Sequence, residues 1–173
     1  MKEEQKYAFR KRIDCVHESG RYDHSLQPSK NETVIDAGWK IAFTPETENA
    51  ALDLQDYFLK SMEMVLGLTT NTADEKVICL QAGGNGRTRG FRFTVTDSRV
   101  ELQGNDYAGV MTGAVYLEDL LNLRKAPYLM RQNVCREPLF SPRMVHSGWG
   151  LDQFPDSHLN AILHAGFDSI LLF

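Results

Sequence analysis

The chain has 173 residues, which is room for one full domain and part of another but not for two complete catalytic domains. Apolar residues make up 42% and charged residues 24% of the sequence, which is typical of globular proteins and unlike disordered ones. Nineteen basic and twenty-three acidic residues give a net charge of −4, so no overall positive field attracts nucleic acid or an anionic membrane. We therefore expect a folded protein with neither nucleic acid nor a membrane as partner.

The cysteines and the N-terminus bear on the cellular compartment. Cys15, Cys79 and Cys135 lie far apart, without a CxxC pair or histidines at zinc-finger spacing, and we interpret them as free thiols. The N-terminus alternates charges and lacks the apolar run of a signal peptide, and no later stretch approaches about 20 apolar residues. As written, the sequence predicts a cytoplasmic protein, or an exported one if a signal has been trimmed from it.

The first half of the chain predicts an arm, a strand and a helix. Residues 1–32 are polar without clear periodicity and are expected to form an N-terminal arm. Apolar and polar residues alternate over 35–43, which predicts one half-buried strand. Thr44 and Pro45 then resemble an N-cap and a first helical residue, and apolar residues at three- and four-residue steps predict a helix that runs to Gly67.

Three further strands and a second helix complete the expected domain. The strand candidates are residues 77–81, 91–95 and 100–103. The last two face each other across Asp97 and Ser98, a pair typical of tight turns. Asp106 is the expected cap of a second helix, whose apolar stripe reaches Leu121. This order predicts the α+β class: a two-layer sandwich of a four-stranded, mostly antiparallel sheet with two helices on one face.

The C-terminal part of the chain has a different pattern. Residues 126–143 contain three prolines and excess positive charge, which predicts a solvated linker between an accessory α/β domain at 33–125 and the rest. Residues 144–173 follow the order strand, helix, strand of a βαβ unit and end in an apolar run at 169–173. Because that last strand has no further partner in sequence, the chain looks cut, and we expect a homodimer through this C-terminal strand.

A family resemblance rests on the hairpin and the second helix. Residues 90–104, followed by Gly109, Gly113 and a leucine-rich stretch to Leu121, resemble the non-catalytic domain that precedes the barrel in β-hexosaminidases of glycoside hydrolase family 20 and in α-glucuronidases. The resemblance extends over roughly residues 33–173. It implies a hexosaminidase-like accessory domain followed by a truncated (β/α)8, or TIM, barrel.

Residues 140–144 and 159–170 resemble the start of that barrel, where hexosaminidases bind the sugar through an arginine on the first strand. The resemblance implies this role for Arg143, and Trp149 offers an aromatic face of the kind that covers a sugar ring. We therefore predict Arg143 and Trp149 as substrate-binding residues. The alternative is that Arg143 pairs with an acid and that Trp149 simply packs. Hexosaminidases usually carry an aspartate a few residues after that arginine and a second arginine soon after, whereas this sequence has Ser147, Gly148, Trp149 and Leu151 there, so substrate specificity stays open.

Other motifs are interpreted as structural. The glycine-rich run 81–90 lacks the phosphate-loop pattern and leads into a strand, which favours a mobile connection between strands. Gly109 and Gly113, one helical turn apart, predict close packing of helix against sheet. The sequence contains no HExxH. Of the histidine candidates His146, His158 and His164, the last two are six residues apart, which puts them on different helical faces. We predict no catalytic residue, cofactor or metal within this chain.

These observations favour an accessory, non-catalytic domain of a carbohydrate-active glycoside hydrolase that supports the barrel. The parent protein is then an O-glycosyl hydrolase that binds carbohydrate through the missing barrel, and this chain alone is expected to be inactive, because the catalytic Asp-Glu pair of such enzymes lies on later strands. One alternative is a complete small carbohydrate-binding or protein-interaction module. Another is a nucleotide-binding enzyme that uses the glycine-rich run.

Overall fold

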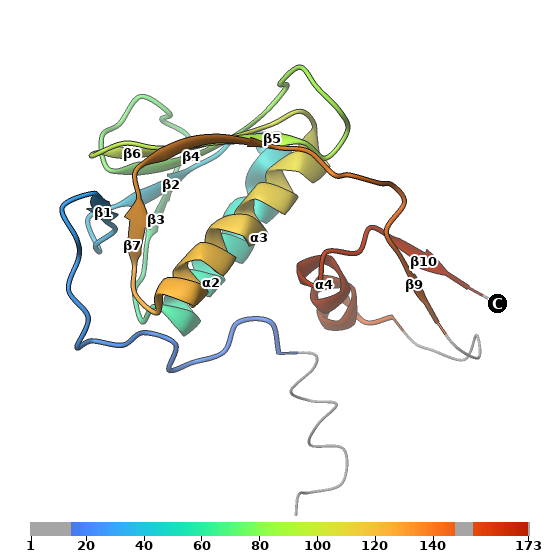
Figure 1. The fold of residues 1–173 in the computed structure, drawn as a ribbon, viewed down its shortest axis with the longest axis horizontal. Coiled ribbons are helices and arrows are strands. Elements are labelled where there is room, and N and C mark those ends of the chain that lie inside the picture. Colours follow the sequence, from blue (N-terminus) through green and yellow to red (C-terminus); the bar gives the residue numbers. More distant parts are fainter. Residues whose placement is uncertain (1–14, 148–153, 173) are drawn as a thin grey trace, which may run out of the picture. The chain divides into compact units, whose positions relative to one another are not determined.

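The computed structural model describes residues 15–147 and 154–172 (Figure 1). The residues from His17 to Pro138 form one compact unit, and the other described residues belong to a second unit. The first unit contains strands β1 (Glu32–Val34), β2 (Lys40–Ala42), β3 (Gly67–Thr69), β4 (Val77–Ala82), β5 (Phe91–Val95), β6 (Arg99–Gly104), β7 (Tyr128–Met130) and β8 (Gln132–Arg136), the 3-10 helix η1 (Pro45–Thr47), and helices α2 (Glu48–Ser61) and α3 (Tyr107–Arg124). The second contains β9 (Met144–His146), α4 (Asp156–His164) and β10 (Ser169–Leu171). None of the helices in the described ranges is long and apolar enough to cross a membrane.

The first unit is an α/β fold built on a six-stranded mixed sheet in the order β3-β2-β4-β6-β5-β8. Strands β3, β2, β4 and β6 are parallel to one another, whereas β5 runs antiparallel to both of its neighbours. Helices α2 and α3 pack on the same face of this sheet (Figure 1). The two-layer arrangement and the hairpin from β5 to β6 are as predicted from the sequence.

The expected four-stranded, mostly antiparallel sheet is wrong in strand number and in direction. Two of the six strands in this sheet were not predicted: β3 has only three residues and begins at Gly67, and β8 lies in the proline-rich segment expected to be a linker. Residues 126–143 therefore supply an edge strand to the sheet. Strand β6 lies between β4 and β5, so β4 pairs in parallel with β6 across six residue pairs. A helical crossover between β2 and β4 likewise makes that pair parallel.

Only the last part of the predicted strand over residues 35–43 is a strand, β2 at 40–42, while β1 lies just before the predicted range. Gly38 donates its backbone N–H to the Asp36 carboxylate at 2.8 Å, and the Trp39 N–H is bonded to the Asp36 carbonyl at 3.0 Å, which closes a turn. Strand β1 leaves this turn to pair antiparallel with β7 in a separate two-stranded sheet. Ile35 and Trp39 are buried although they lie outside any strand. The alternation of apolar residues therefore marks which side chains are buried, but it does not mark a continuous strand.

The predicted first helix begins where expected but ends earlier. Pro45 opens η1, and α2 continues from it to Ser61 instead of reaching Gly67. Glu63 adopts a left-handed φ of 56°, which no helix continues through, and Val65 is 63% exposed. The second helix is confirmed with its cap, because the Asp106 carboxylate accepts a hydrogen bond from the Gly109 N–H at 2.7 Å.

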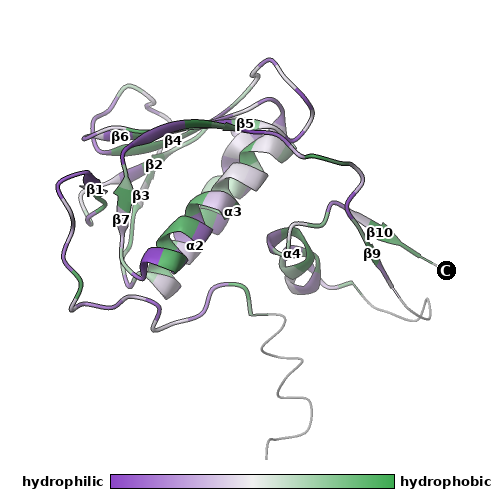
Figure 2. Cartoon of the chain, in the orientation of Figure 1, coloured by the Kyte–Doolittle hydropathy of each residue, from purple (hydrophilic) through white to green (hydrophobic). Residues whose placement is uncertain are grey.

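The core lies between the sheet and the two helices. Its largest buried side chains come from β2, β4, β5 and β6 on one side and from α2 on the other, and they include Ile41, Leu54, Phe58, Ile78, Leu80, Phe93 and Leu102. Figure 2 shows hydrophobic residues interspersed with polar ones along α3, which lies in front of α2 in this view, and a largely hydrophobic strand β10. A small second cluster of Ala42, Val77 and Cys79 is buried on the opposite face of the sheet.

Two glycines let α3 approach the sheet, as predicted. A Cβ on Gly109 would lie 2.3 Å from the Gly90 carbonyl oxygen, and one on Gly113 would lie 2.7 Å from the Leu102 side chain. Neither distance is compatible with a side chain in this packing. The predicted close contact between helix and sheet is therefore confirmed.

The second unit has the predicted βαβ order. Strands β9 and β10 are parallel, with Met144 opposite Ser169 and His146 opposite Leu171, and α4 connects them. Gly166 follows the helix with a left-handed φ of 86°. Leu171 and Leu172 are exposed, so this apolar run is not covered on both faces by the described residues.

Candidate functional site

Arg143, a predicted substrate-binding residue, lies directly before β9. Its backbone N–H donates to the Asp168 carboxylate at 2.9 Å, and its Nε lies 4.0 Å from the second carboxylate oxygen. Asp168 is buried and directly precedes β10, so both residues lie at the N-terminal ends of the two parallel strands. Asp168 is thus the acidic partner that the alternative interpretation of Arg143 requires. The contact between Arg143 and a sugar stays a prediction. Trp149 lies outside the described residues.

The glycine-rich run connects β4 to β5 and borders a polar hollow of about 300 Å³. Arg92 and Gln103 face each other across β5 and β6 within this hollow. Asn105 donates from its amide to the Arg87 carbonyl at 2.8 Å, which holds the run over the end of the sheet. Phe91 is the aromatic residue of the lining, and it is only 5% exposed. The hollow therefore offers hydrogen-bonding groups without an open aromatic face.

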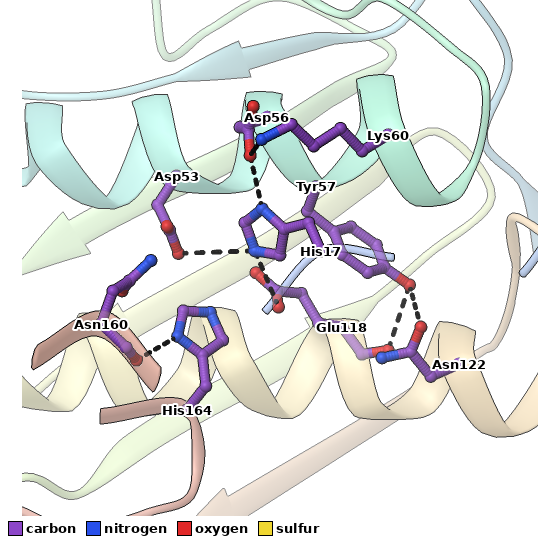
Figure 3. A network of polar contacts seen from close by, with 9 residues as sticks. All are labelled: His17, Asp53, Asp56, Tyr57, Lys60, Glu118, Asn122, Asn160 and His164. Atoms are coloured by element: carbon purple, nitrogen blue, oxygen red, sulfur yellow. Dashed lines mark hydrogen bonds and ion pairs between the residues drawn. The ribbon is translucent and has the colours of Figure 1, made fainter. Parts of the chain in front are cut away.

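A buried charged cluster joins the arm to both helices (Figure 3). Only 3% of the His17 side chain is exposed. Its Nδ1 lies 2.7 Å from the Asp56 carboxylate, and its Nε2 lies 3.5 Å from Glu118 and 4.0 Å from Asp53. Asp53 and Asp56 come from α2 and Glu118 comes from α3, so a single imidazole contacts both helices.

Tyr57 and Asn122 support this cluster. The Tyr57 ring meets the His17 ring edge-on, with centroids 5.6 Å apart. Its hydroxyl donates toward the Asn122 side-chain oxygen at 3.0 Å and the Glu118 carbonyl at 3.2 Å. Burial, followed by the charge of Glu118, raises the pKa of Tyr57, so the hydroxyl keeps its proton and remains a donor.

The charges around His17 shape its protonation. Burial by itself lowers the pKa of His17, but hydrogen bonds to Glu118 and Asp56 and the charges of Glu118 and Asp53 outweigh burial and raise it. Burial pushes the pKa of Asp56 upward, yet hydrogen bonds from Lys60 and His17 lower it overall, and Lys60 lies 2.8 Å away. Three carboxylates thus surround one imidazole, and the arrangement favours a positive charge between them.

Sequence reasoning did not single out this cluster. His17 lies in the arm, which has no periodicity, and Asp53 and Asp56 resemble ordinary helix-surface acids. The one available signal was Glu118, a carboxylate on the buried stripe of α3 between Leu117 and Leu121. Of the histidines considered from the sequence, His164 has its Nδ1 2.9 Å from the Asn160 carbonyl within the second unit.

No protein-family model and no curated protein matches the sequence. Solved structures do match. A family 20 exo-β-N-acetylglucosaminidase from Vibrio harveyi has a TM-score of 0.62 at 11% identity, over 83% of this chain and 23% of that one. A family 115 4-O-methyl-α-glucuronidase with specificity for decorated arabinogalactans has a TM-score of 0.63 at 11% identity, over 81% of this chain and 26% of that one. A family 138 glycoside hydrolase targeting pectin rhamnogalacturonan II has a TM-score of 0.58 at 15% identity, over 78% of this chain and 24% of that one.

The similarity falls on the N-terminal quarter or so of these enzymes. At this level of identity the likeness concerns the fold. This chain spans about a quarter of the length of the chains that it matches. The resemblance found in the sequence is thereby confirmed as a structural similarity.

Proposed function

We propose that this chain carries a non-catalytic accessory domain of a glycoside hydrolase, and that the domain supports a catalytic (β/α)8 barrel. The observation that supports this proposal most is the match of about four-fifths of the chain to the N-terminal region of enzymes from three glycoside hydrolase families. The enzymes differ in substrate but share this part of the fold, which is expected of a supporting domain and not of a specificity-determining one.

The second unit supports the same proposal. Parallel strands β9 and β10 joined by helix α4 repeat the unit from which (β/α)8 barrels are built. Residues following Phe173 would then supply the other strands and the pair of carboxyl groups that glycoside hydrolysis requires. Carbohydrate would bind in that barrel, at the C-terminal ends of its strands. Trp149 follows β9 in the sequence and stays a proposed contact. Arg143 lies at the N-terminal end of β9, beside Asp168, so its proposed sugar contact has less support.

The alternative of a self-sufficient carbohydrate-binding module has less support. Sugar sites combine hydrogen bonds with an exposed aromatic face that covers the apolar side of the ring. The polar hollow beside Arg92 and Gln103 supplies hydrogen-bonding groups, but its aromatic residue Phe91 is buried against the helix side, where its ring lies 5.5 Å from Tyr116. This polar face suits a supporting role better than sugar capture.

Two measurements test the proposed function. The coding sequence after codon 173 should continue for about the length of a barrel, roughly 250 residues. The purified 173-residue chain should hydrolyse aryl glycosides no faster than a buffer blank, because a preorganised, closed site supplies most of an enzyme's acceleration. A stop codon directly after Phe173, or turnover that disappears in Arg143→Ala, would contradict the proposal.

A further inference from the structure

We propose that His17, Asp53 and Glu118 bind one divalent transition-metal cation, and that Asp56 orients the histidine for this role. The proposal goes beyond a supporting role in a glycoside hydrolase and concerns the first unit alone. All four residues lie between His17 and Pro138, and they come from the arm and the two helices that cover the sheet.

The orientation of His17 is the first argument. Histidines that bind metals usually donate their second ring N–H to a carboxylate, which fixes the tautomer and turns the other nitrogen toward the ion. Asp56 lies 2.7 Å from Nδ1 and fills the role of that carboxylate. The lone pair of Nε2 then faces Glu118 and Asp53, and this approach of three electron-rich atoms is favourable once a cation lies between them.

The spacing is the second argument. A tetrahedral ion with bonds of about 2.0–2.2 Å to nitrogen and oxygen separates its ligand atoms by roughly 3.4 Å. The distance from His17 Nε2 is 3.5 Å to Glu118 and 4.0 Å to Asp53. Glu118 already has the required separation from Nε2, and Asp53 reaches it with a shift of roughly half an ångström. The ligand atoms of the three residues all lie within 4.8 Å of one another.

Charge and burial indicate the kind of ion. Glu118 is as buried as His17, with 3% of its side chain exposed. Two carboxylates and one neutral imidazole balance a charge of +2, which removes the cost of placing like charges together away from water. One imidazole nitrogen with carboxylate oxygens suits Zn²⁺ and its transition-metal neighbours, whereas Mg²⁺ and Ca²⁺ prefer oxygen ligands alone. A bound ion would fasten residue 17 to α2 and α3.

Isothermal titration calorimetry with Zn²⁺ tests the proposal on tag-free chain stripped with a chelator. We expect one saturable site per chain that millimolar Mg²⁺ does not occupy. His17→Ala and Glu118→Gln should abolish this site, and Asp56→Asn should weaken it by about 10- to 100-fold, as expected for a partner that orients a ligand. His24→Ala is the matched control, because His24 is an exposed arm histidine with its Nε2 3.1 Å from Glu63. It should leave Zn²⁺ binding unchanged.

A second measurement keeps the test decisive if the variants unfold, which circular dichroism would reveal. Zn K-edge absorption of the wild-type complex should show an imidazole in a shell otherwise made of oxygen. A shell without imidazole, the absence of a saturable site in the wild type, or unchanged affinity in folded His17→Ala would each overturn the proposal. A protonated His17 would then be what bridges the three carboxylates.

Discussion

At the scale of single residues, the close contact between α3 and the sheet depends on two glycines, which have no Cβ atom. Gly109 lies against the backbone of Gly90, so a methyl group there meets a carbonyl that cannot rotate away. At Gly113 the methyl group meets the side chain of Leu102, and a side chain can shift more readily than a backbone carbonyl. The two positions therefore differ in how well they tolerate alanine, although both lie in the same helix.

We expect Gly109→Ala to lower the free energy of unfolding by about 1–3 kcal/mol, the usual cost of overpacking. This loss exceeds the roughly 0.5–1 kcal/mol that alanine contributes to a helix relative to glycine. Gly113→Ala should cost less. Urea denaturation measures both, with Gly67→Ala as the control, because its Cβ would meet Lys40 at an ordinary 3.7 Å. A Gly109→Ala protein as stable as the wild type would show that α3 can move off the sheet.

A partly buried ion pair should make stability depend on pH. Arg124 bonds Glu32 at 2.6 Å and 3.2 Å, and these hydrogen bonds lower the pKa of Glu32 below its usual value of 4.5. Because the folded-state pKa is depressed, the stabilisation is complete above pH 4.5 and is lost as the pH falls through the folded-state value. Glu32→Gln should reduce stability at pH 7 and flatten this acid-side loss in urea titrations. Glu46→Gln, at an exposed position, is the control and should change neither.

Some residue roles could be predicted from the sequence and others could not. Gly109 and Gly113 could be assigned correctly because two glycines one turn apart on a helix are typical of close packing against a neighbouring element. His17 could not, because its partners lie far along the chain on two helices, and no local pattern encodes their convergence. Arg143 was found by resemblance, yet its bond to Asp168 arises only when β9 and β10 pair in parallel.

At the scale of elements, Asp106 links two neighbouring segments. Its carboxylate accepts the Gly109 N–H at the start of α3 and also the Arg89 N–H, at 3.1 Å and 3.2 Å, at the end of the glycine-rich run. We expect Asp106→Ala to lower the free energy of unfolding by about 1–2 kcal/mol, since loss of an N-cap alone costs this much. Asp106→Asn keeps an accepting oxygen and should lose less. Equal losses in the two variants, measured by thermal or urea unfolding, would argue against the cap.

Elements with strong local signals were predictable, and those defined by their neighbours were not. Helix α3 has a cap and a long apolar stripe, and the β5–β6 hairpin has a turn pair between alternating residues. Strands β3 and β8 have neither, because an edge strand needs only one partner and little burial. The position of β6 between β4 and β5 also lacks a local signal, since burial patterns do not state which strand is adjacent to which.

At the scale of the whole molecule, the part of the expected arm from residue 17 to residue 32 belongs to the first unit. His17 contacts α2 and α3, the Asp23 N–H donates to the Lys125 carbonyl at 2.8 Å, and Glu32 begins a strand that pairs with β7. These contacts tie the polar N-terminal segment to the end of α3 and to the strand after it. Polar composition predicted a separate arm because charged partners, not apolar burial, hold this segment in place.

The last prediction concerns the C-terminal strand. Among the described residues β10 pairs only with β9, and Leu171 and Leu172 are 41% and 62% exposed. An apolar strand with one open edge recruits another chain, and each large side chain so buried contributes about 2 kcal/mol. We expect concentration-dependent self-association of the 173-residue chain in analytical ultracentrifugation. Deletion of residues 167–173 should reduce it while circular dichroism shows that the sheet and helices persist.

Point variants distinguish self-association through this strand from non-specific hydrophobic association through other surfaces. Leu172→Lys should weaken self-association as the deletion does, because a charge on an edge strand opposes pairing with another chain. Leu123→Lys, at an 83% exposed position on α3, should leave it unchanged. If the deletion unfolds the entire chain, the tail belongs to the core and the separate barrel unit is wrong. Association that survives both the deletion and Leu172→Lys places the contact on another surface.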